Sequence, residues 1–131
     1  MRTRYRVLVV DDNNDTVETI STVLESAGFD VISADSGSAC RELIETCNPD
    51  ILILDVMLDT LTEGLTVYCD IRGNPRFDDI PIILISAIDR EIGFPLDLNS
   101  ASKDVFLEKP IDPSHLVASI EHLIGCRENS S

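Results

Sequence analysis

Residues 6–12 read RVLVVDD and residues 51–55 read ILILD, and these two stretches decide the fold. Each is an aliphatic run of strand length that ends in aspartate. Apolar residues without alternation indicate strands buried on both faces, as in a parallel sheet covered by helices. In open parallel sheets, functional groups lie just beyond the carboxyl ends of the strands. Asp11, Asp12 and Asp55 are therefore predicted to meet at one edge of a sheet.

Three carboxylates at one edge repel each other, and a bound cation would offset that repulsion. Mg²⁺ is the expected ion, because it is a hard cation that prefers carboxylate oxygen and keeps several waters. Lys109 follows a third short run, DVFLE at residues 104–108, and precedes Pro110. Its ammonium group is a point charge suited to a phosphoryl group. These residues predict a phosphorylation site on Asp55 with Mg²⁺ as cofactor.

The rest of the chain alternates between strand and helix patterns, which predicts a parallel sheet with helices on both faces. Strands are expected at residues 5–10, 30–34, 51–54, 80–86 and 105–107, and helices at 13–27, 37–47, 65–72 and from Asp112-Pro113 onward. Residues 89–102 occupy the place of a further helix, but Gly93 and Pro95 predict that it is short or broken. We expect one domain over residues 1–125 and a frayed polar tail at 126–131.

Charge and hydropathy exclude several classes of protein. The formal net charge of −14 would repel nucleic-acid phosphates and anionic lipid, so neither direct nucleic-acid binding nor membrane binding is expected. The longest apolar runs are strand-sized, and the N-terminus lacks a signal-peptide cleavage pattern. A cytoplasmic location is therefore expected.

The cysteines and histidines carry no recognisable site motif. No CxxC pair occurs, so the cysteines are expected to be free thiols, and the two histidines, seven residues apart, are expected at the surface. These residues are Cys40, Cys47, Cys69, Cys126, His115 and His122.

Five landmarks in order give the chain a resemblance to a known family. They are the acidic pair Asp11-Asp12, then Asp55, Ser86-Ala87, Phe106 and Lys109-Pro110, each in or after an expected strand. In this order and spacing, the chain resembles a response-regulator receiver domain of two-component signalling over nearly its whole length. The resemblance implies a doubly wound, five-stranded parallel sheet of order 2-1-3-4-5 with five helices, the flavodoxin-like or CheY-like arrangement.

The resemblance also implies a role for each acidic residue. Asp55 would accept a phosphoryl group from a histidine kinase, a phosphotransfer protein or a small donor such as acetyl phosphate. Asp12 would bind Mg²⁺ directly, Asp11 mainly through water, and the backbone carbonyl of Met57 would complete the set. The only catalysis implied is the chain's own phosphorylation and dephosphorylation, so it is not expected to be an enzyme.

The remaining landmarks would bind the phosphoryl group and change conformation in response to it. Lys109, Ser86 and the N–H of Ala87 would bind its oxygens, and the sequence leaves the Lys109-Pro110 bond open as cis or trans. Ser86 would move toward the phosphoryl group and Phe106 would fill the space that it leaves. The face that changes would dock an output partner or a second copy in a phosphorylation-dependent dimer.

The chain departs from the family pattern in the loop after Asp55. Gly64 stands nine residues after Asp55 (64 − 55), two more than is usual in the family, and the loop has no proline. The insertion either changes kinase docking or metal access, or is a tolerated surface insertion. Met57 and Ile88 occupy positions that flank the path of hydrolytic water in the family, and both are apolar. Slow self-dephosphorylation is expected.

Two other functions that involve phosphate groups, phosphatase activity and nucleotide binding, lack the residues that they need. A haloacid-dehalogenase type of phosphatase needs a second aspartate two residues after its nucleophile, but position 57 is Met. No GxGxxG or GxxxxGK[ST] motif for nucleotide binding occurs. The alternative function is a receiver-fold module that binds partners without phosphorylation. The sequence does not decide whether the chain acts alone or is one domain of a longer regulator, and it does not name the partner.

Overall fold

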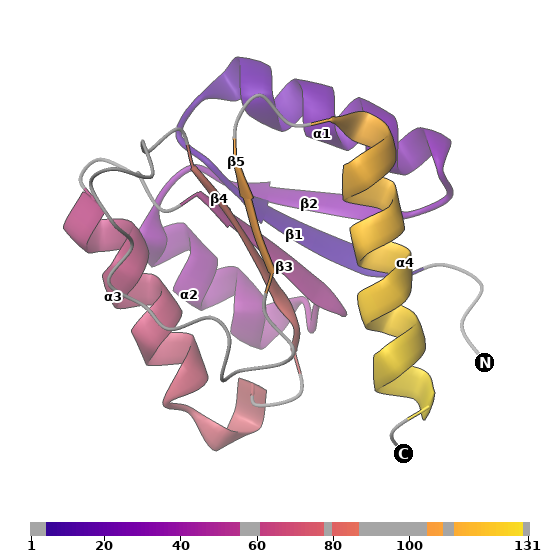
Figure 1. The fold of residues 1–131 in the computed structure, drawn as a ribbon. Helices are drawn as coiled ribbons and strands as arrows, with labels where there is room; N and C mark the ends of the chain where they lie inside the picture. The colour runs from indigo at the N-terminus through magenta and orange to yellow at the C-terminus, as the bar shows by residue number, and fades with distance from the viewer. Residues whose placement is uncertain (1–4, 56–60, 78–79, 87–104, 109–111, 130–131) are drawn as a thin grey trace.

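A computed structural model of the chain describes residues 5–55, 61–77, 80–86, 105–108 and 112–129. Strands and helices alternate along most of the described chain (Figure 1). The elements are β1 (Arg6–Val10), α1 (Asn14–Ser26), β2 (Asp30–Ala34), α2 (Gly37–Thr46), β3 (Ile51–Asp55), α3 (Leu61–Arg72), the 3₁₀ turn η1 (Pro75–Phe77), β4 (Ile82–Ser86), β5 (Val105–Glu108) and α4 (Pro113–Asn129).

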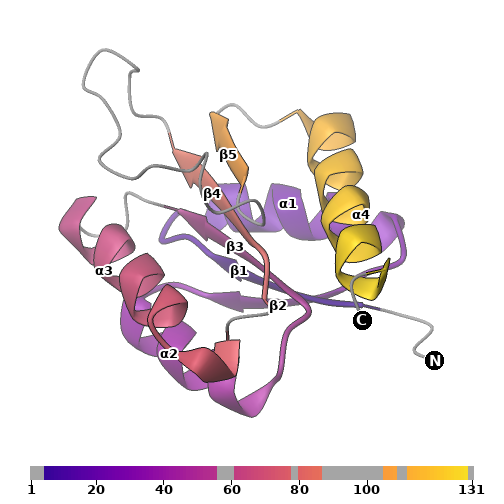
Figure 2. The same cartoon turned by 60° about the horizontal axis from the view of Figure 1, so that its bottom comes forward.

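The strands form one parallel sheet in the order β2-β1-β3-β4-β5. Helices α1 and α4 cover one face, and α2 and α3 cover the other (Figures 1 and 2). The predicted doubly wound α/β class is confirmed, and the strand order is the one that the resemblance implied. The helix expected within residues 89–102 lies outside the described residues.

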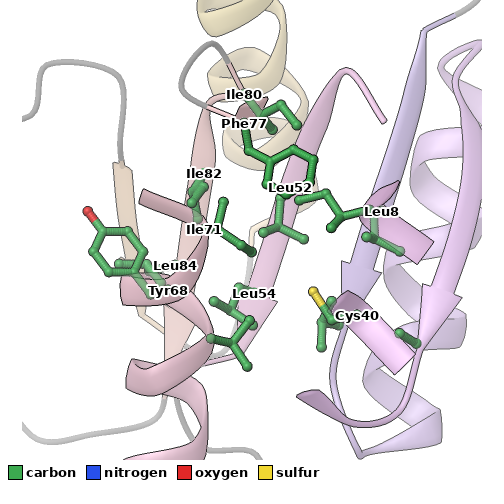
Figure 3. Close-up of a cluster of buried hydrophobic side chains, with 14 residues drawn as sticks. Leu8, Cys40, Leu52, Leu54, Tyr68, Ile71, Phe77, Ile80, Ile82 and Leu84 are labelled. Atoms are coloured by element: carbon green, nitrogen blue, oxygen red, sulfur yellow. The ribbon is translucent and has the colours of Figure 1, made fainter. Parts of the chain in front are cut away.

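Two aliphatic clusters fill the spaces between the sheet and its helices. Alternate residues of β1, β3 and β4 enter opposite clusters: Leu8, Leu52 and Ile82 belong to the cluster under α2 and α3, as Figure 3 shows. Their neighbours Val7, Ile51 and Ile83 belong to the cluster under α1 and α4. Because both faces are buried, these strands need apolar residues at every position, which explains the runs in the sequence.

Most element boundaries agree with the sequence expectations. Gly28 ends the first helix as predicted and has φ of +96°, a backbone conformation that glycine adopts without a steric cost. Asp112 caps α4 as predicted, because its Oδ1 accepts from the backbone N–H groups of Ser114 (2.9 Å) and His115 (3.2 Å). Helix starts can therefore be predicted where a capping side chain precedes a periodic apolar run.

Three boundaries differ from the expectations by two residues or more. Helix α3 begins at Leu61 rather than at residue 65, with Gly64 buried inside it, so this glycine does not stop the helix. Strand β4 begins at Ile82 because Pro81 has no N–H for the ladder, although the Pro81 carbonyl accepts from Leu52 N at 3.1 Å. Helix α4 continues to Asn129, so residues 126–129 are helical rather than a frayed tail.

Among the described residues, no helix is long and apolar enough to cross a bilayer. His115 and His122 are exposed on α4, as expected.

Free thiols in contrasting surroundings are found at Cys40, Cys47 and Cys69. Cys40 is fully buried in the cluster of Figure 3. Burial raises the pKa of its thiol to about 12, and the positive charge of the nearby Arg41 opposes this rise only in part. Cys69 is exposed on α3. Since the thiolate is the reactive form, Cys40 is protected twice, by its protonation and by its burial.

We predict that a maleimide or iodoacetamide near pH 8 labels Cys69 at least about a hundredfold faster than Cys40 in the folded protein. Peptide mapping by mass spectrometry over time measures both rates in one sample. In concentrated guanidinium chloride the two rates should converge. Equal rates in the folded protein would show that Cys40 is not enclosed by the core.

Candidate functional site

Three carboxylates converge at the carboxyl end of β1 and β3. Val10 is in register with Leu54, and Asp11 and Asp55 are the next residues along their chains. One carboxylate oxygen from each of Asp11, Asp12 and Asp55 lies within 4.8 Å of the others. The prediction that these residues meet at one edge of the sheet is confirmed.

Burial divides the three carboxylates into two kinds. Asp11 is 1% exposed and Asp55 is 3% exposed, whereas Asp12 is exposed to solvent. Charged carboxylates are rarely buried without compensating partners, since removal from water disfavours the charged form. The site therefore concentrates negative charge where water screens it poorly.

Hydrogen bonds fix Asp11 at both its backbone and its side chain. Its backbone N–H donates to the Ala34 carbonyl at 3.1 Å, which ties it to the end of β2. Its Oδ1 accepts from the backbone N–H of Asn13 at 2.9 Å. Asn13 is in turn the N-cap of α1, with extended backbone angles and a side chain that accepts from the first-turn N–H groups of Asp15 and Thr16. The carboxylate is thus held between a strand end and a helix start.

The donor set fits a hard divalent cation. All three candidates offer carboxylate oxygens, the ligands that Mg²⁺ and Ca²⁺ prefer, and no imidazole or thiolate joins them in the one metal-competent cluster found among the described residues. A bound divalent ion would also neutralise charges that otherwise repel. Both the donor chemistry and the electrostatics therefore favour a cation here.

The sheet register places two further predicted residues by their backbones. Asp55 pairs with Ile85 of β4. The residue after Ile85 is Ser86, which ends β4 and pairs with Glu108. Phe106 lies within β5, opposite Leu84. The side chains of Ser86 and Phe106 are outside the part of the structure that is described, as are residues Met57, Ala87, Ile88 and Lys109, so their predicted roles stay predictions.

The sequence reasoning missed Asn13 as part of the site. It placed the residue at the start of a helix but did not connect it to the acidic pair. An asparagine directly before a periodic apolar run is a capping signal, so the cap itself could have been predicted. No residue pattern in the sequence indicates the hydrogen bond from the Asn13 backbone N–H to Asp11.

A third buried carboxylate lies at the opposite, amino end of β1 and β3 and has a structural role. Asp50, 2% exposed, accepts from the backbone N–H of Arg6 at 2.8 Å. The Arg6 guanidinium donates to the Cys47 carbonyl at the end of α2. This arrangement ties the start of β1 to the turn before β3.

Comparison with known proteins identifies the family. The family model of the response regulator receiver domain matches residues 7–121. This chain belongs to the response regulator receiver domain family. The receiver domain is 33% identical over 119 residues to the alkaline phosphatase synthesis transcriptional regulatory protein PhoP of Bacillus subtilis, covering 91% of this chain and 48% of that relative. It is 32% identical over 123 residues to the transcriptional regulator RpaA of Synechocystis, again covering 91% and 48%.

Solved structures agree with this assignment. A sensor protein from Polaromonas superposes with a TM-score of 0.83 at 26% identity, covering 94% of this chain and 98% of that one. A response regulator structure from Chloroflexus aurantiacus gives 0.77 at 28% identity, covering 93% and 98%. The receiver domain spans about half the length of the curated relatives named above.

Carboxylate repulsion predicts that the site lowers stability in the absence of divalent ions. Asp55→Asn, which keeps the shape but removes one buried charge, should raise the free energy of unfolding in EDTA by about 1–2 kcal/mol. Urea denaturation followed by circular dichroism measures the difference. The control is Glu121→Gln at an exposed position of α4, where a change within about 0.5 kcal/mol is expected. An Asp55→Asn protein no more stable than the wild type would show that the carboxylates do not repel.

Proposed function

We propose that the receiver domain accepts a phosphoryl group on Asp55 in a Mg²⁺-dependent reaction and thereby switches a partner-binding surface. The observation that carries the proposal is the convergence of the Asp11, Asp12 and Asp55 carboxylates at one sheet edge, two of them buried. Membership of the receiver family supports the same chemistry.

Asp55 would act as the nucleophile. One of its carboxylate oxygens attacks phosphorus in the phosphohistidine of a histidine kinase or phosphotransfer protein, and an acyl phosphate P–O bond forms. The P–N bond of the donor breaks, and the leaving imidazole keeps the electron pair and takes up a proton. With acetyl phosphate, the P–O bond to acetate breaks instead. Nothing else is transformed, so the chain's catalysis is confined to itself.

The buried position of Asp55 would favour this attack. A carboxylate held at the end of a rigid strand presents its oxygen in one orientation, which lowers the entropic cost of reaching the transition state. Asp11, Asp12 and Asp55, with the backbone carbonyl of Met57, would hold Mg²⁺. When bound, the ion supplies positive charge that stabilises the phosphoryl oxygens. Asp12, exposed, would bind it directly, and Asp11 mainly through water.

Lys109, Ser86 and the N–H of Ala87 would contact the phosphoryl oxygens in this proposal. The strand register supports it for Ser86, whose backbone ends the strand beside Asp55. Phosphorylation would then favour the state in which Ser86 moves toward the phosphoryl group and Phe106 fills the vacated space, a shift between two populations.

The output would come from a partner or from a further domain. MtrA of Mycolicibacterium smegmatis is named a DNA-binding response regulator, and the receiver domain covers 49% of it at 32% identity. With a net charge of −14, the receiver domain itself would repel DNA, so we place any such output outside residues 7–121. A docked protein partner or a phosphorylation-dependent dimer would read the switch.

Intact mass spectrometry after incubation with acetyl phosphate and Mg²⁺ tests the proposal. We expect a single phosphoryl adduct on the wild type and none on Asp55→Asn or in EDTA, because the nucleophile or the cation is then missing. Glu121→Gln, the exposed-site control on α4, should form the adduct as the wild type does.

Failure of the wild type to form the adduct, repeated with phosphoramidate to exclude a poor donor, would contradict the proposal. The receiver-fold module that binds partners without phosphorylation would then be the better function. An adduct that persists in Asp55→Asn would move the acceptor to another residue.

The lifetime of the phosphorylated form is a separate prediction. Met57 and Ile88 offer no carboxylate or amide to orient a hydrolytic water, so we expect slow self-dephosphorylation. The double variant Met57→Asn, Ile88→Glu should shorten the half-life about tenfold or more, since positioned general base catalysis contributes about a hundredfold or more. Loss of the adduct mass over time measures both half-lives. An unchanged half-life would remove these residues from the explanation.

A further inference from the structure

Asn13 belongs to two structures at once, the carboxylate site and the first helix. Its backbone N–H donates to Asp11 Oδ1 at 2.9 Å. Its side-chain oxygen accepts from Asp15 N at 2.9 Å and from Thr16 N at 3.3 Å. Its carbonyl accepts from Val17 N at 3.1 Å, the first hydrogen bond of the helix. A single residue therefore joins the acidic site to α1.

These hydrogen bonds connect the packing of α1 to the orientation of the Asp11 carboxylate. The side-chain cap fixes Asn13 relative to the first turn of α1, and α1 is anchored by Ile20 and Leu24, which are buried against the sheet. The backbone N–H of Asn13 is thereby fixed in space, and through its hydrogen bond it restrains the orientation of the buried Asp11 carboxylate. On the other side, the Ala34 carbonyl holds the backbone of Asp11. Removing the cap would loosen the restraint that Asn13 places on the Asp11 carboxylate.

We propose that Asn13 is a positioning residue for the divalent-cation site: its capped conformation holds the Asp11 carboxylate in the orientation that binds the ion, mainly through a water of its hydration shell. The inference rests on the proposed Mg²⁺ function of the site. It assigns the residue after the acidic pair a role distinct from that of a ligand, since Asn13 acts only through Asp11.

Two effects of losing the cap oppose each other, and their sizes decide the outcome. A frayed first turn weakens the positive end of the helix dipole, which would favour the cation by about fivefold at most. Loss of the groups that orient a metal ligand commonly weakens metal binding by about tenfold to a hundredfold. The net expectation is weaker binding, by about threefold to tenfold, because the cap acts through Asp11, which would contact the ion mainly through water.

Isothermal titration calorimetry with MgCl₂ on the purified chain tests this role. Asn13→Ala should weaken Mg²⁺ binding by about threefold to tenfold, whereas Asn13→Ser, which keeps a capping oxygen, should stay within about twofold of the wild type. The matched control is Ser36→Ala. Ser36 caps α2 through Ala39 N at 3.2 Å, so its loss costs a similar helix cap without touching Asn13.

Thermal unfolding in EDTA separates positioning from stability. Asn13→Ala and Ser36→Ala should both lower the melting temperature, but only Asn13→Ala should weaken Mg²⁺ binding. The Mg²⁺ concentration for half-maximal phosphorylation should rise in Asn13→Ala, while the rate at saturating Mg²⁺ stays near that of the wild type. If Asn13→Ala does not fold, Asn13→Gly takes its place, because glycine is tolerated at N-caps but offers no side-chain oxygen.

The outcomes distinguish this inference from the proposed function. A wild type that does not bind Mg²⁺ would overturn the metal-dependent function and the inference with it. A wild type that binds, with Asn13→Ala binding equally well, would overturn only the inference and leave Asn13 as a helix cap. Equal weakening by Ser36→Ala would overturn it as well, since the effect would then follow from stability alone.

Discussion

Electrostatic repulsion among Asp11, Asp12 and Asp55 is the constraint on which the site depends. Two unit charges at the 4.8 Å limit of this cluster repel by about 3–4 kcal/mol at an effective dielectric constant of 20. That is a large fraction of the net stability of about 5–15 kcal/mol that is usual for a domain. The rest of the fold must therefore hold the carboxylates together against a force that would separate them.

The aliphatic sheet provides that resistance. The residues before the acids, Val10 and Leu54, are fully buried on the central strands β1 and β3, with β2 and β4 on either side. Close-packed interiors do not deform continuously, so the strand ends cannot move apart to relieve the charge. A bound cation would relieve the repulsion without moving the strands, and binding energy that would otherwise be lost in rearrangement would then go into affinity for the ion.

The sheet, the acidic cluster and the cap of α4 could all be predicted from the sequence. Uninterrupted apolar runs identify doubly buried strands, and the rule for the carboxyl edge of parallel strands then brings Asp11 and Asp55 together. The sequence was insufficient for the start of α3, because Gly64 has a low helix propensity that burial inside the helix overrides. It was also insufficient for the bond between Asn13 and Asp11, because such a bond depends on backbone angles that no residue pattern specifies.

The unequal exposure of the three acids suits different tasks. Asp11 and Asp55 are almost excluded from water, and the orientation of Asp11 is set by the Asn13 N–H, so neither can adjust far when a ligand arrives. Asp12 is exposed on the connection between β1 and α1 and can change rotamer at little cost. A site that combines one exposed carboxylate with two buried ones would suit an ion that must lose water as it binds. If an ion binds here, the exposed Asp12 would be the carboxylate that a hydrated ion reaches from solvent, and Asp11 and Asp55 would hold it at the sheet edge. Burying all three would slow the entry of an ion, and exposing all three would leave Asp55, the nucleophile of the proposed reaction, without a defined orientation.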